Sequence, residues 1–281
     1  MKLVSKSDIE EFIAQGFLRI TVPQSIRETV TAAFNAGYPF FRAVPEEKIA
    51  NKLPEDGGYR PYGIEYSDSP EVLDQIESFT ASDRTRKATK TLRHKNARIL
   101  HKQMLKAFDA LEDIAESVTI HLAEAITGEL YENRYRGAMR RWSRLQLNYA
   151  RPANTTTPFI NEAHEDGVLM TLVCATCPGF ELQMPSGEFV PLTTRPGELI
   201  AMGGEITWLL SGGLIQPVYH RVSPAGAYSE RLSLIFLGDV YPRLCQPWVK
   251  NETNANIDIG ERVLTSAARF GLQAFKNERE D

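Results

Sequence analysis

Two histidines and an aspartate are placed so that their side chains could bind one metal ion. His164 and Asp166 are two positions apart, and His220 follows later in the chain. On a β-strand, such a spacing predicts that His164 and Asp166 face the same side while Glu165 faces away. Two imidazoles and one carboxylate on one side of a metal leave the opposite coordination positions open. That ligand set is typical of non-haem Fe(II) sites, where a co-substrate and dioxygen take the open positions.

Arg231 and Ser233 show the same spacing a short distance beyond His220. On one strand they would set a guanidinium beside a hydroxyl, an arrangement suited to binding a carboxylate. Arg231 also opens a strongly apolar strand, and a buried arginine is costly unless an anion meets it. The alternative is a hydrogen-bonded loop pair of His164 and Asp166, with His220 as an ordinary strand residue and a surface charge at position 231. The conjunction of the three motifs favours the metal and anion sites.

The composition is that of an ordinary soluble globular protein, with 42% hydrophobic and 24% charged residues in a chain of 281. This length suits one large domain or two small ones. A formal net charge of −4 gives no reason to expect nucleic-acid binding. No apolar run approaches membrane-spanning length, and the charged N-terminus lacks the apolar core of a secretory signal. We therefore expect a cytoplasmic protein that binds neither nucleic acid nor membranes; the sequence predicts no oligomeric state.

The other histidines and the cysteines predict no second metal site. Three cysteines, an odd number, argue against a disulfide framework. Cys174 and Cys177 fit half of a zinc knuckle, a redox pair, or two small residues at the end of a buried strand. We favour the strand because no second C-x-x-C is present and a Pro-Gly turn follows. His94, His101 and His121 lie on or beside a predicted helix without a ligand at metal-binding spacing, so packing or surface roles are expected.

The periodicity of the sequence changes near residue 137. Before it, apolar residues recur every three or four positions from Leu100 to Ile126, which predicts a long amphipathic helix that ends near Gly128. After it, short alternating segments are separated by proline and glycine, which indicates an all-β sandwich or barrel. The predicted strands are 142–149, 169–175, 180–184, 189–192, 198–202, 218–222 and 231–237, with a helical turn at 206–210.

The N-terminal part predicts mainly helices. We expect a helix at 8–14, a strand at 16–20, and a longer helix from Pro23 that the segment 38–41, which contains Pro39, would break. A short helical turn follows from Pro45, the charged stretch 83–90 fits a solvated loop, and a last helix is expected at 260–276. The prediction is one α+β domain over residues 1–281: a mainly helical region (1–137), a β-barrel core (138–246) and a C-terminal helical segment (247–281).

These motifs resemble those of the isopenicillin N synthase-like family of Fe(II)- and 2-oxoglutarate-dependent dioxygenases. That family carries H-x-D, a distal H-R-V and R-x-S on a double-stranded β-helix, or jelly roll. This chain has H-E-D at 164–166, H-R-V at 220–222 and R-L-S at 231–233, in the same order. The similarity extends to L-N-Y-A-R-P at 147–152, to G-F at 16–17, and to F-F, P-E-E-K and G-Y between residues 40 and 59. The resemblance covers most of residues 16–238 and implies a jelly-roll core.

The resemblance also implies a role for each motif residue. It assigns Fe(II) to three ligands: His164, Asp166 and His220. It assigns the distal carboxylate of 2-oxoglutarate to Arg231 and Ser233, with dioxygen as the second co-substrate. The implied reaction is hydroxylation, desaturation or ring closure of a small molecule, with an amino acid or a specialised metabolite as candidates.

The strand before the H-x-D motif carries three further candidates. The second tyrosine of the family's N-Y-Y-P is Ala150 here, which removes one expected contact to 2-oxoglutarate, although Asn148 can still contribute. If Asn148 faces inward, strand alternation turns Gln146 and Arg144 inward as well. An inward Arg144 near the iron would suit a substrate carboxylate. The alternative is that Arg144 lies at the start of the strand and reaches water.

Two other functions fit the same motifs. One is an Fe(II) oxidase of the same fold that takes its electrons from the substrate rather than from 2-oxoglutarate. The other is a jelly roll that binds a metal, such as zinc, without turnover; zinc would favour a closed tetrahedral set, and only three good ligands are visible. The aromatic and basic stretch 59–63 would lie at the active-site mouth or form an ordered surface loop.

Overall fold

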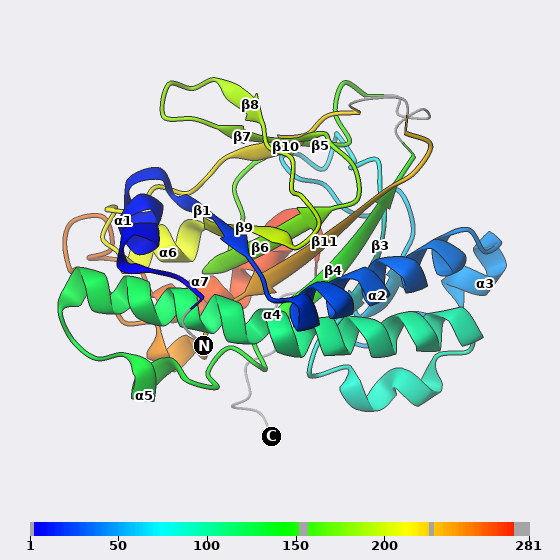
Figure 1. The fold of residues 1–281 in the computed structure, drawn as a ribbon, viewed down its shortest axis with the longest axis horizontal. Helices are drawn as coiled ribbons and strands as arrows, with labels where there is room; N and C mark the ends of the chain where they lie inside the picture. Colours follow the sequence, from blue (N-terminus) through cyan, green and yellow to red (C-terminus); the bar gives the residue numbers. More distant parts are fainter. Residues whose placement is uncertain (1–2, 152–156, 225–227, 273–281) are drawn as a thin grey trace.

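Two β-sheets face each other in the computed structural model of the protein, which describes residues 3–151, 157–224 and 228–272 (Figure 1). All strand pairs within these residues are antiparallel. The order of the large sheet is β1 (Phe17–Thr21), β9 (Glu198–Gly203), β6 (Met170–Ala175), β11 (Arg231–Gly238), β4 (Arg144–Ala150), β3 (Glu77–Ala81) and β2 (Gly58–Arg60). The order of the small sheet is β5 (Asn161–His164), β10 (His220–Val222), β7 (Phe180–Gln183) and β8 (Phe189–Pro191).

This arrangement confirms the expected jelly roll in an α+β protein. The strands predicted from alternation agree with β4 and with β6 to β11 within a few residues. Strands β1, β2 and β3 come from the N-terminal part of the chain and extend the large sheet on both sides.

Alternation along β4 and β11 separates the core from the space between the sheets. Leu147 and Leu234 pack into the large apolar core on one face. Gln146 and Asn148 point to the other face, where they line a cavity. Because β4 and β11 pair with Asn148 opposite Ser233, the polar residues of both strands form one row that faces the small sheet.

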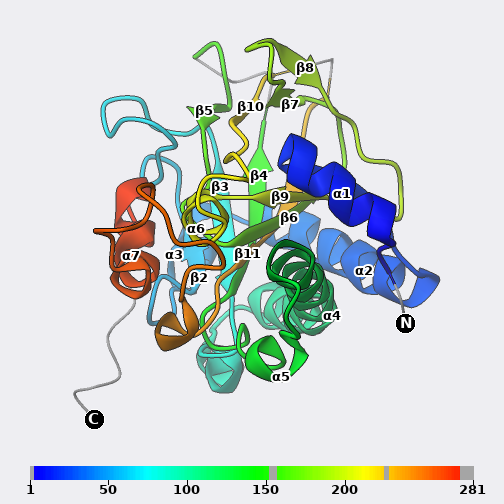
Figure 2. The ribbon, with the colours of Figure 1, turned by 90° about the vertical axis from the view of Figure 1, so that its left-hand side faces the viewer.

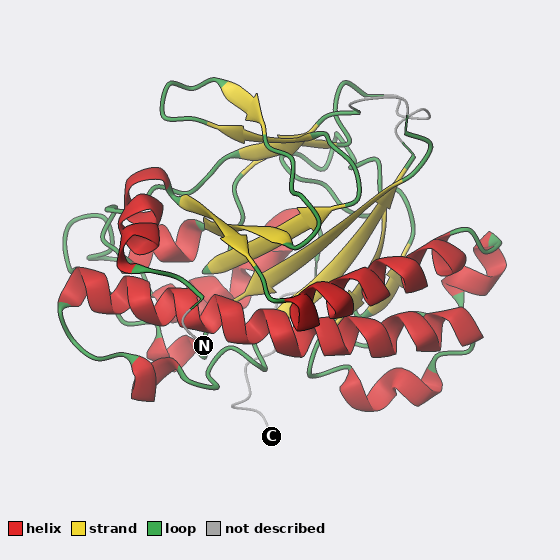
Figure 3. Cartoon of the chain, in the orientation of Figure 1, coloured by secondary structure: helices red, strands yellow, loops and turns green. Residues whose placement is uncertain are grey.

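Two long helices, α2 (Gln24–Phe41) and α4 (Lys95–Thr127), cover the outer face of the large sheet (Figures 1 and 3). The apolar residues of α4 are buried at three- and four-residue intervals, and Phe108 meets Phe236 of β11 with 5.4 Å between ring centroids. Gly128 ends the helix with a φ of 73°, a conformation that favours glycine. The predicted long helix is confirmed, and no helix in the described parts of the chain has both the length and the apolar character to cross a membrane.

The expected break in the second helix is wrong, because α2 continues through Pro39 to Phe41. A proline inside a helix costs about 3 kcal/mol, because it removes a hydrogen bond and its ring clashes with the preceding turn. Phe40 and Phe41 are fully buried here, and each buried phenylalanine contributes about 1.5–3 kcal/mol. Phe41 also stacks on Tyr149 of β4, with 5.0 Å between ring centroids. The aromatic packing therefore outweighs the proline.

The charged stretch 83–90 is also not a free solvated loop. It leads into a 3₁₀ helix, η1 (Arg86–Thr91). Arg86 pairs with Asp109 at 2.6 Å, which ties the segment to the long helix α4, and Arg140 pairs with Asp83 at 3.1 Å. The other short helices are α1 (Lys6–Gln15), α3 (Pro45–Ile49), α5 (Glu132–Tyr135), α6 (Glu205–Leu210) and η3 (Pro242–Leu244).

The C-terminal segment lies beside the two sheets (Figure 2). It consists of α7 (Ile259–Thr265) followed by a 3₁₀ helix, η4 (Ser266–Phe270). The single helix predicted over 260–276 is wrong beyond Thr265, because the chain tightens to 3₁₀ geometry and Gly271 ends it in the left-handed region, with a φ of 74°. Residues 273–276 of that prediction lie outside the described residues.

Candidate active site

The three predicted metal ligands converge, although not from one continuous strand. β5 ends at His164, and His220 opens β10 directly opposite it in the small sheet. Asp166 lies in the loop after β5, so the expected strand geometry for His164 and Asp166 is wrong. Helix α6 holds this loop in place, because the N–H of Glu205 at the start of α6 donates to the carbonyl oxygen of Asp166 at 2.9 Å.

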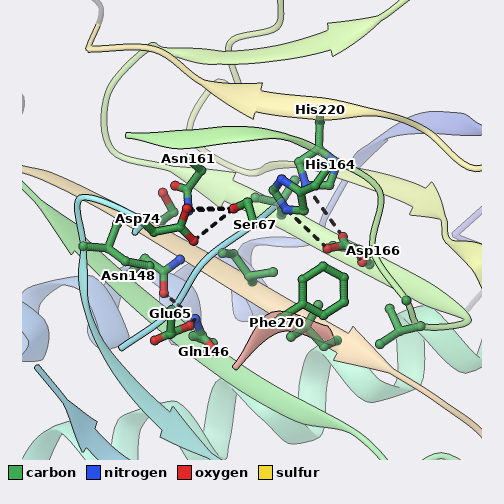
Figure 4. A pocket seen from close by; sticks show the side chains of 18 of the residues that line it. Glu65, Ser67, Asp74, Gln146, Asn148, Asn161, His164, Asp166, His220 and Phe270 are labelled. Carbon is green, nitrogen blue, oxygen red and sulfur yellow. Dashed lines mark hydrogen bonds and ion pairs between the residues drawn. The ribbon is translucent and has the colours of Figure 1, made fainter. Parts of the chain in front are cut away.

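The ligand atoms and their hydrogen bonds fit a metal centre (Figure 4). The Nε2 atoms of His164 and His220 lie 3.9 and 3.8 Å from the carboxylate oxygens of Asp166, and the three ligand atoms lie within 4.8 Å of one another. Nδ1 of His164 is 2.7 Å from the carbonyl oxygen of Glu162, and Nδ1 of His220 is 3.1 Å from that of Val218. Because a carbonyl oxygen can only accept, each Nδ1 carries the proton and each Nε2 offers its lone pair to the metal.

Burial and charge at the site also suit a divalent cation. Burial, followed by the charge of His220, lowers the pKa of His164, and the neutral imidazole is the form that binds metal. The hydroxyl of Thr171 donates to Oδ2 of Asp166 at 2.6 Å and so orients the carboxylate. No fourth protein ligand joins the group in the described residues, which leaves coordination positions open as Fe(II) chemistry requires. The residues present therefore fit Fe(II) better than a closed zinc set.

Arg231 is almost fully buried, and one of its nitrogens has no partner among the described residues. Nε donates to the carbonyl oxygen of Pro178 at 3.1 Å, and Nη1 donates to the hydroxyl of Ser233. Nη2 is buried without a partner in the described part of the chain. Burial lowers the pKa of Arg231 to about 10, so the guanidinium stays charged at neutral pH. A buried, unpaired N–H is costly, and because Arg231 and Ser233 line the same cavity as the metal ligands, the site favours an anion there.

A chain of hydrogen bonds fixes the amide of Asn148. Nη2 of Arg60 can only donate, and it lies 2.6 Å from one side-chain atom of Gln146, which must therefore be Oε1. The amide nitrogen of Gln146 then donates to Glu65 at 2.7 Å and to Oδ1 of Asn148 at 2.8 Å. The NH₂ group of Asn148, which has no hydrogen-bond partner within the described residues, is then a donor on the cavity wall beside Ser233 in the strand register.

Arg144 opens β4, is buried, and lines the cavity, so the alternative in which it reaches water is wrong. Burial lowers its pKa to about 10, and the charge of Asp239 opposes this. Arg144 pairs with Leu237 near the end of β11, whereas Arg231 begins that strand. Six residues of strand span about 20 Å, so Arg144 and Arg231 lie at different ends of the cavity.

The loop between β2 and β3 contributes polar residues that the sequence did not single out. Glu65, Ser67 and Asp74 all line the cavity (Figure 4). The Ser67 hydroxyl is 2.9 Å from both carboxylate oxygens of Asp74, and burial raises the pKa of Asp74 to about 6, so it is ionised at neutral pH. No periodicity marks residues 61–76, which is why these groups were missed. Within the predicted stretch 59–63, Arg60 reaches the site through Gln146, whereas Tyr59 packs in the core.

The C-terminal segment closes one side of the cavity. Ser266, Phe270 and Leu272 line it together with the metal ligands. Arg269 holds the segment in place: Nη1 lies 2.6 Å from Glu205, and Nη2 lies 3.3 Å from Glu165. Phe270 falls within the helix predicted over 260–276, but no pattern in the sequence indicated that it would meet the metal site.

The remaining histidines and cysteines behave as packing residues. The His101 ring is fully buried, with hydroxyl oxygens of Thr85 and Thr89 at 3.0 and 2.7 Å from its two nitrogens. Cys174 is buried in β6, Cys177 is partly buried, and both are free thiols. Both findings agree with the sequence prediction. His94 pairs with Glu47 at 3.0 Å, and His121 contacts the carbonyl oxygen of Ser117 at 2.6 Å.

Comparison with known proteins agrees with this geometry. Residues 141–239, which hold all three metal ligands, match the model of the 2OG-Fe(II) oxygenase superfamily. This part of the chain is therefore a 2OG-Fe(II) oxygenase domain. A domain of this class is an enzyme that uses Fe(II), 2-oxoglutarate and dioxygen. The resemblance drawn from the sequence motifs is confirmed. A search of curated protein sequences gave no match.

Solved structures share the fold over nearly the whole chain. A full-length Neurospora crassa protein, in complex with alpha-KG (2-oxoglutarate) and 5-formyluracil, is 16% identical with a TM-score of 0.72, covering 92% of this chain and 88% of that one. A putative 2OG-Fe(II) oxygenase family protein from Caulobacter crescentus is 19% identical with a TM-score of 0.70, covering 92% and 91%. The rice dioxygenase for auxin oxidation is 20% identical with a TM-score of 0.61, covering 84% and 79%.

Proposed function

We propose that this protein oxidises a small organic molecule with Fe(II), 2-oxoglutarate and dioxygen. The observation that carries the proposal is the pairing of an open three-ligand centre with a buried anion site in one cavity. The unpaired Nη2 of Arg231 supports a ligand with an anionic group at that end of the cavity, because a buried N–H without a partner is unfavourable.

Each residue then has a defined task. His164, Asp166 and His220 would hold Fe(II), which, when bound, activates dioxygen at the expense of 2-oxoglutarate. Arg231 and Ser233 would receive the distal carboxylate of 2-oxoglutarate through two neighbouring donors.

Other groups of the cavity would orient the ligands and keep water out. The free amide donor of Asn148 would bind the co-substrate beside Ser233. Gln146 holds Asn148 in that orientation and, with Arg144, would face the substrate. Ile235 and Leu237 add apolar lining next to these groups.

The substrate proposed is a small molecule, with an amino acid or a specialised metabolite as candidates. The cavity holds about 110 Å³ and is closed on one side by the C-terminal segment, which suits a small molecule rather than a polymer. The Neurospora crassa protein has been solved with thymine and with 5-formyluracil, which supports a ligand of similar size here. The proposed reaction is hydroxylation, desaturation or ring closure of this small molecule.

Release of labelled carbon dioxide from 1-¹⁴C-2-oxoglutarate, with succinate as co-product, tests the proposal. The purified protein should release both with Fe(II) and a stimulating small molecule, and His220→Ala should abolish release because it removes a metal ligand. His121→Ala, on α4 away from the cavity, is the matched control and should leave release unchanged. Oxidation of a substrate without labelled carbon dioxide would support a 2-oxoglutarate-independent oxidase instead, and metal binding without any turnover would support a non-catalytic jelly roll.

A further inference from the structure

A buried carboxylate, Asp74, faces the cavity, and no lysine or arginine of the described ranges forms an ion pair with it. It is 6% exposed and lines the cavity together with Ser67 and Asn161 (Figure 4). The Ser67 hydroxyl lies 2.9 Å from both carboxylate oxygens of Asp74. The amide nitrogen of Asn161 lies 3.5 Å from that hydroxyl, and hydrogen bonding by Asn161 also stabilises the charged form of the carboxylate. One shared hydroxyl and one amide cannot satisfy the four lone-pair positions of a carboxylate. The carboxylate therefore has acceptor capacity left on the side of the cavity.

Each of the other acids of the cavity wall has a positive charge or the proposed metal position near it. Glu65 forms an ion pair with Arg60 at 2.9 Å. Asp239 lies in the field of Arg144 and accepts the N–H of Leu169 at 2.9 Å. Asp166 belongs to the metal centre.

Asp74 differs from these acids. It forms no ion pair with a lysine or an arginine in the described residues. The nearest group that could become positive is His164, whose charge acts on Asp74. A histidine that ligates Fe(II) through Nε2 stays neutral, however, so it cannot serve as the counter-ion.

We propose that Asp74, with Ser67 and Asn161, binds a protonated nitrogen of the substrate, so that the substrate is a small amine. This deepens the proposed function and rests on it. A buried carboxylate without a counter-ion is unfavourable, and an ammonium group supplies both the missing charge and up to three N–H donors. The Asn161 amide nitrogen points toward Ser67, which leaves the amide oxygen as a second acceptor for the same group.

The position of this subsite suits the chemistry of the cavity. The co-substrate carboxylate is expected at Arg231 and Ser233, which lie on β11 of the large sheet. Asp74 comes from the loop before β3, and its charge acts on His164. An amine held by Asp74 therefore occupies a wall that the co-substrate leaves free, with its neighbouring C–H bonds inside the cavity that the metal ligands share.

Binding can be measured without turnover. The protein is loaded with Zn(II) and 2-oxoglutarate, and dissociation constants are determined by ligand-observed NMR for propylamine, pyrrolidine, piperidine and benzylamine. The N-acetyl derivative of each amine, which lacks the charge, is the paired probe. Thymine is included as an uncharged ring with N–H donors. The variants are Asp74→Asn and the matched control Asp68→Asn, which makes the same change at an exposed position of the same loop.

The wild-type protein and Asp68→Asn should bind at least one amine about tenfold or more tightly than its N-acetyl derivative, the effect of a hydrogen bond between charged groups. Asp74→Asn should lose that preference. If Asp74→Asn does not fold, Ser67→Ala and Asn161→Ala should each reduce the preference several-fold. Equal binding of amines and N-acetyl derivatives, a preference that survives Asp74→Asn, or tighter binding of thymine than of every amine would overturn the proposal. Because no turnover is needed, absence of carbon dioxide release would count against the proposed function alone.

Discussion

The phenyl ring of Phe270 meets the imidazole of His164 edge-on, with 6.1 Å between ring centroids and 62° between ring planes. Gly167, which follows the proposed metal ligand Asp166, makes this contact possible. A Cβ atom at Gly167 would lie 3.1 Å from Cβ of Ser266 and 3.2 Å from Cε2 of Phe270. The C-terminal segment therefore forms part of the wall around the metal position.

Replacement of Phe270 by alanine should make the metal more accessible. With the ring removed, water and small chelators reach the histidine ligands more easily, so we expect Fe(II) to be lost to a coloured chelator several-fold faster than from the wild-type protein. Stopped-flow absorbance measures this rate. Leu214→Ala, at a residue 56% exposed, removes an apolar side chain elsewhere and should leave the rate unchanged. Equal rates for Phe270→Ala and the wild type would show that the ring does not shield the metal.

Two arginines of the C-terminal segment share one carboxylate, so Glu205→Gln should loosen the segment. Glu205 is buried and lies 2.7 Å from Arg262 and 2.6 Å from Arg269. We expect the free energy of unfolding to fall by about 1.5–3 kcal/mol, the range for hydrogen bonds to charged groups, as measured by urea denaturation. Glu10→Gln breaks an exposed pair with Lys6 and should have a much smaller effect. Similar losses for both variants would contradict a special role of Glu205.

Arg231→Lys should weaken 2-oxoglutarate binding although it keeps the positive charge. The donors of a lysine lie on a single nitrogen, so it lacks the planar fork with which Arg231 donates to Pro178 and Ser233 and still directs Nη2 to the ligand. We expect the dissociation constant to rise roughly 10- to 100-fold, measured by calorimetry on the Mn(II)-loaded protein. Arg195→Lys, at an exposed position, should bind like the wild type. Unchanged affinity of Arg231→Lys would place the co-substrate elsewhere.

The fold could be predicted where periodicity and motifs agree. The alternation of β11 and the apolar stripe of α4 follow from residue spacing alone, and both elements appear as expected. The failures have one cause in common, which is packing between distant parts of the chain. Pro39 stays inside α2 because Phe40 and Phe41 are buried against the sheet. The local sequence pattern does not predict that burial.

The candidate site divides in the same way. His164, Asp166, His220, Arg231 and Ser233 could be found because their types and spacing suit one chemistry. Asp74 could not, since it lies in a segment without regular periodicity, and Phe270 could not, since the helix predicted around it gave no sign that it would reach the cavity. Even the ligand pair converges through a loop held by α6, rather than through the strand that its spacing predicted.

Stability should fall in mild acid because of His101. Burial, followed by the charge of Arg86, lowers the pKa of His101 to about 4, whereas an unfolded histidine titrates near 6.5. The unfolded chain therefore binds the proton more readily, and the free energy of unfolding decreases as the pH falls from about 6.5 to 4. The full loss from this group is about 3 kcal/mol.

Denaturation midpoints at several pH values check this prediction. His101→Gln should show a flatter pH dependence over the same range, because its amide does not titrate. NMR should find the His101 ring still neutral at pH 5. A ring that is protonated at pH 5 would contradict the prediction.

Arg144→Ala should raise the KM for a substrate that carries a carboxylate while leaving 2-oxoglutarate binding unchanged. Arg144 lines the cavity about 20 Å along the strands from Arg231, so it cannot contact the same carboxylate of the co-substrate. We expect an increase of about tenfold or more for the acid and little change for the corresponding amide. Because loss of Arg144 also leaves Asp239 without its nearby positive charge, Arg144→Lys is the companion variant and should retain part of the preference. The idea fails if the acid and the amide are affected equally, or if the KM for the acid does not change.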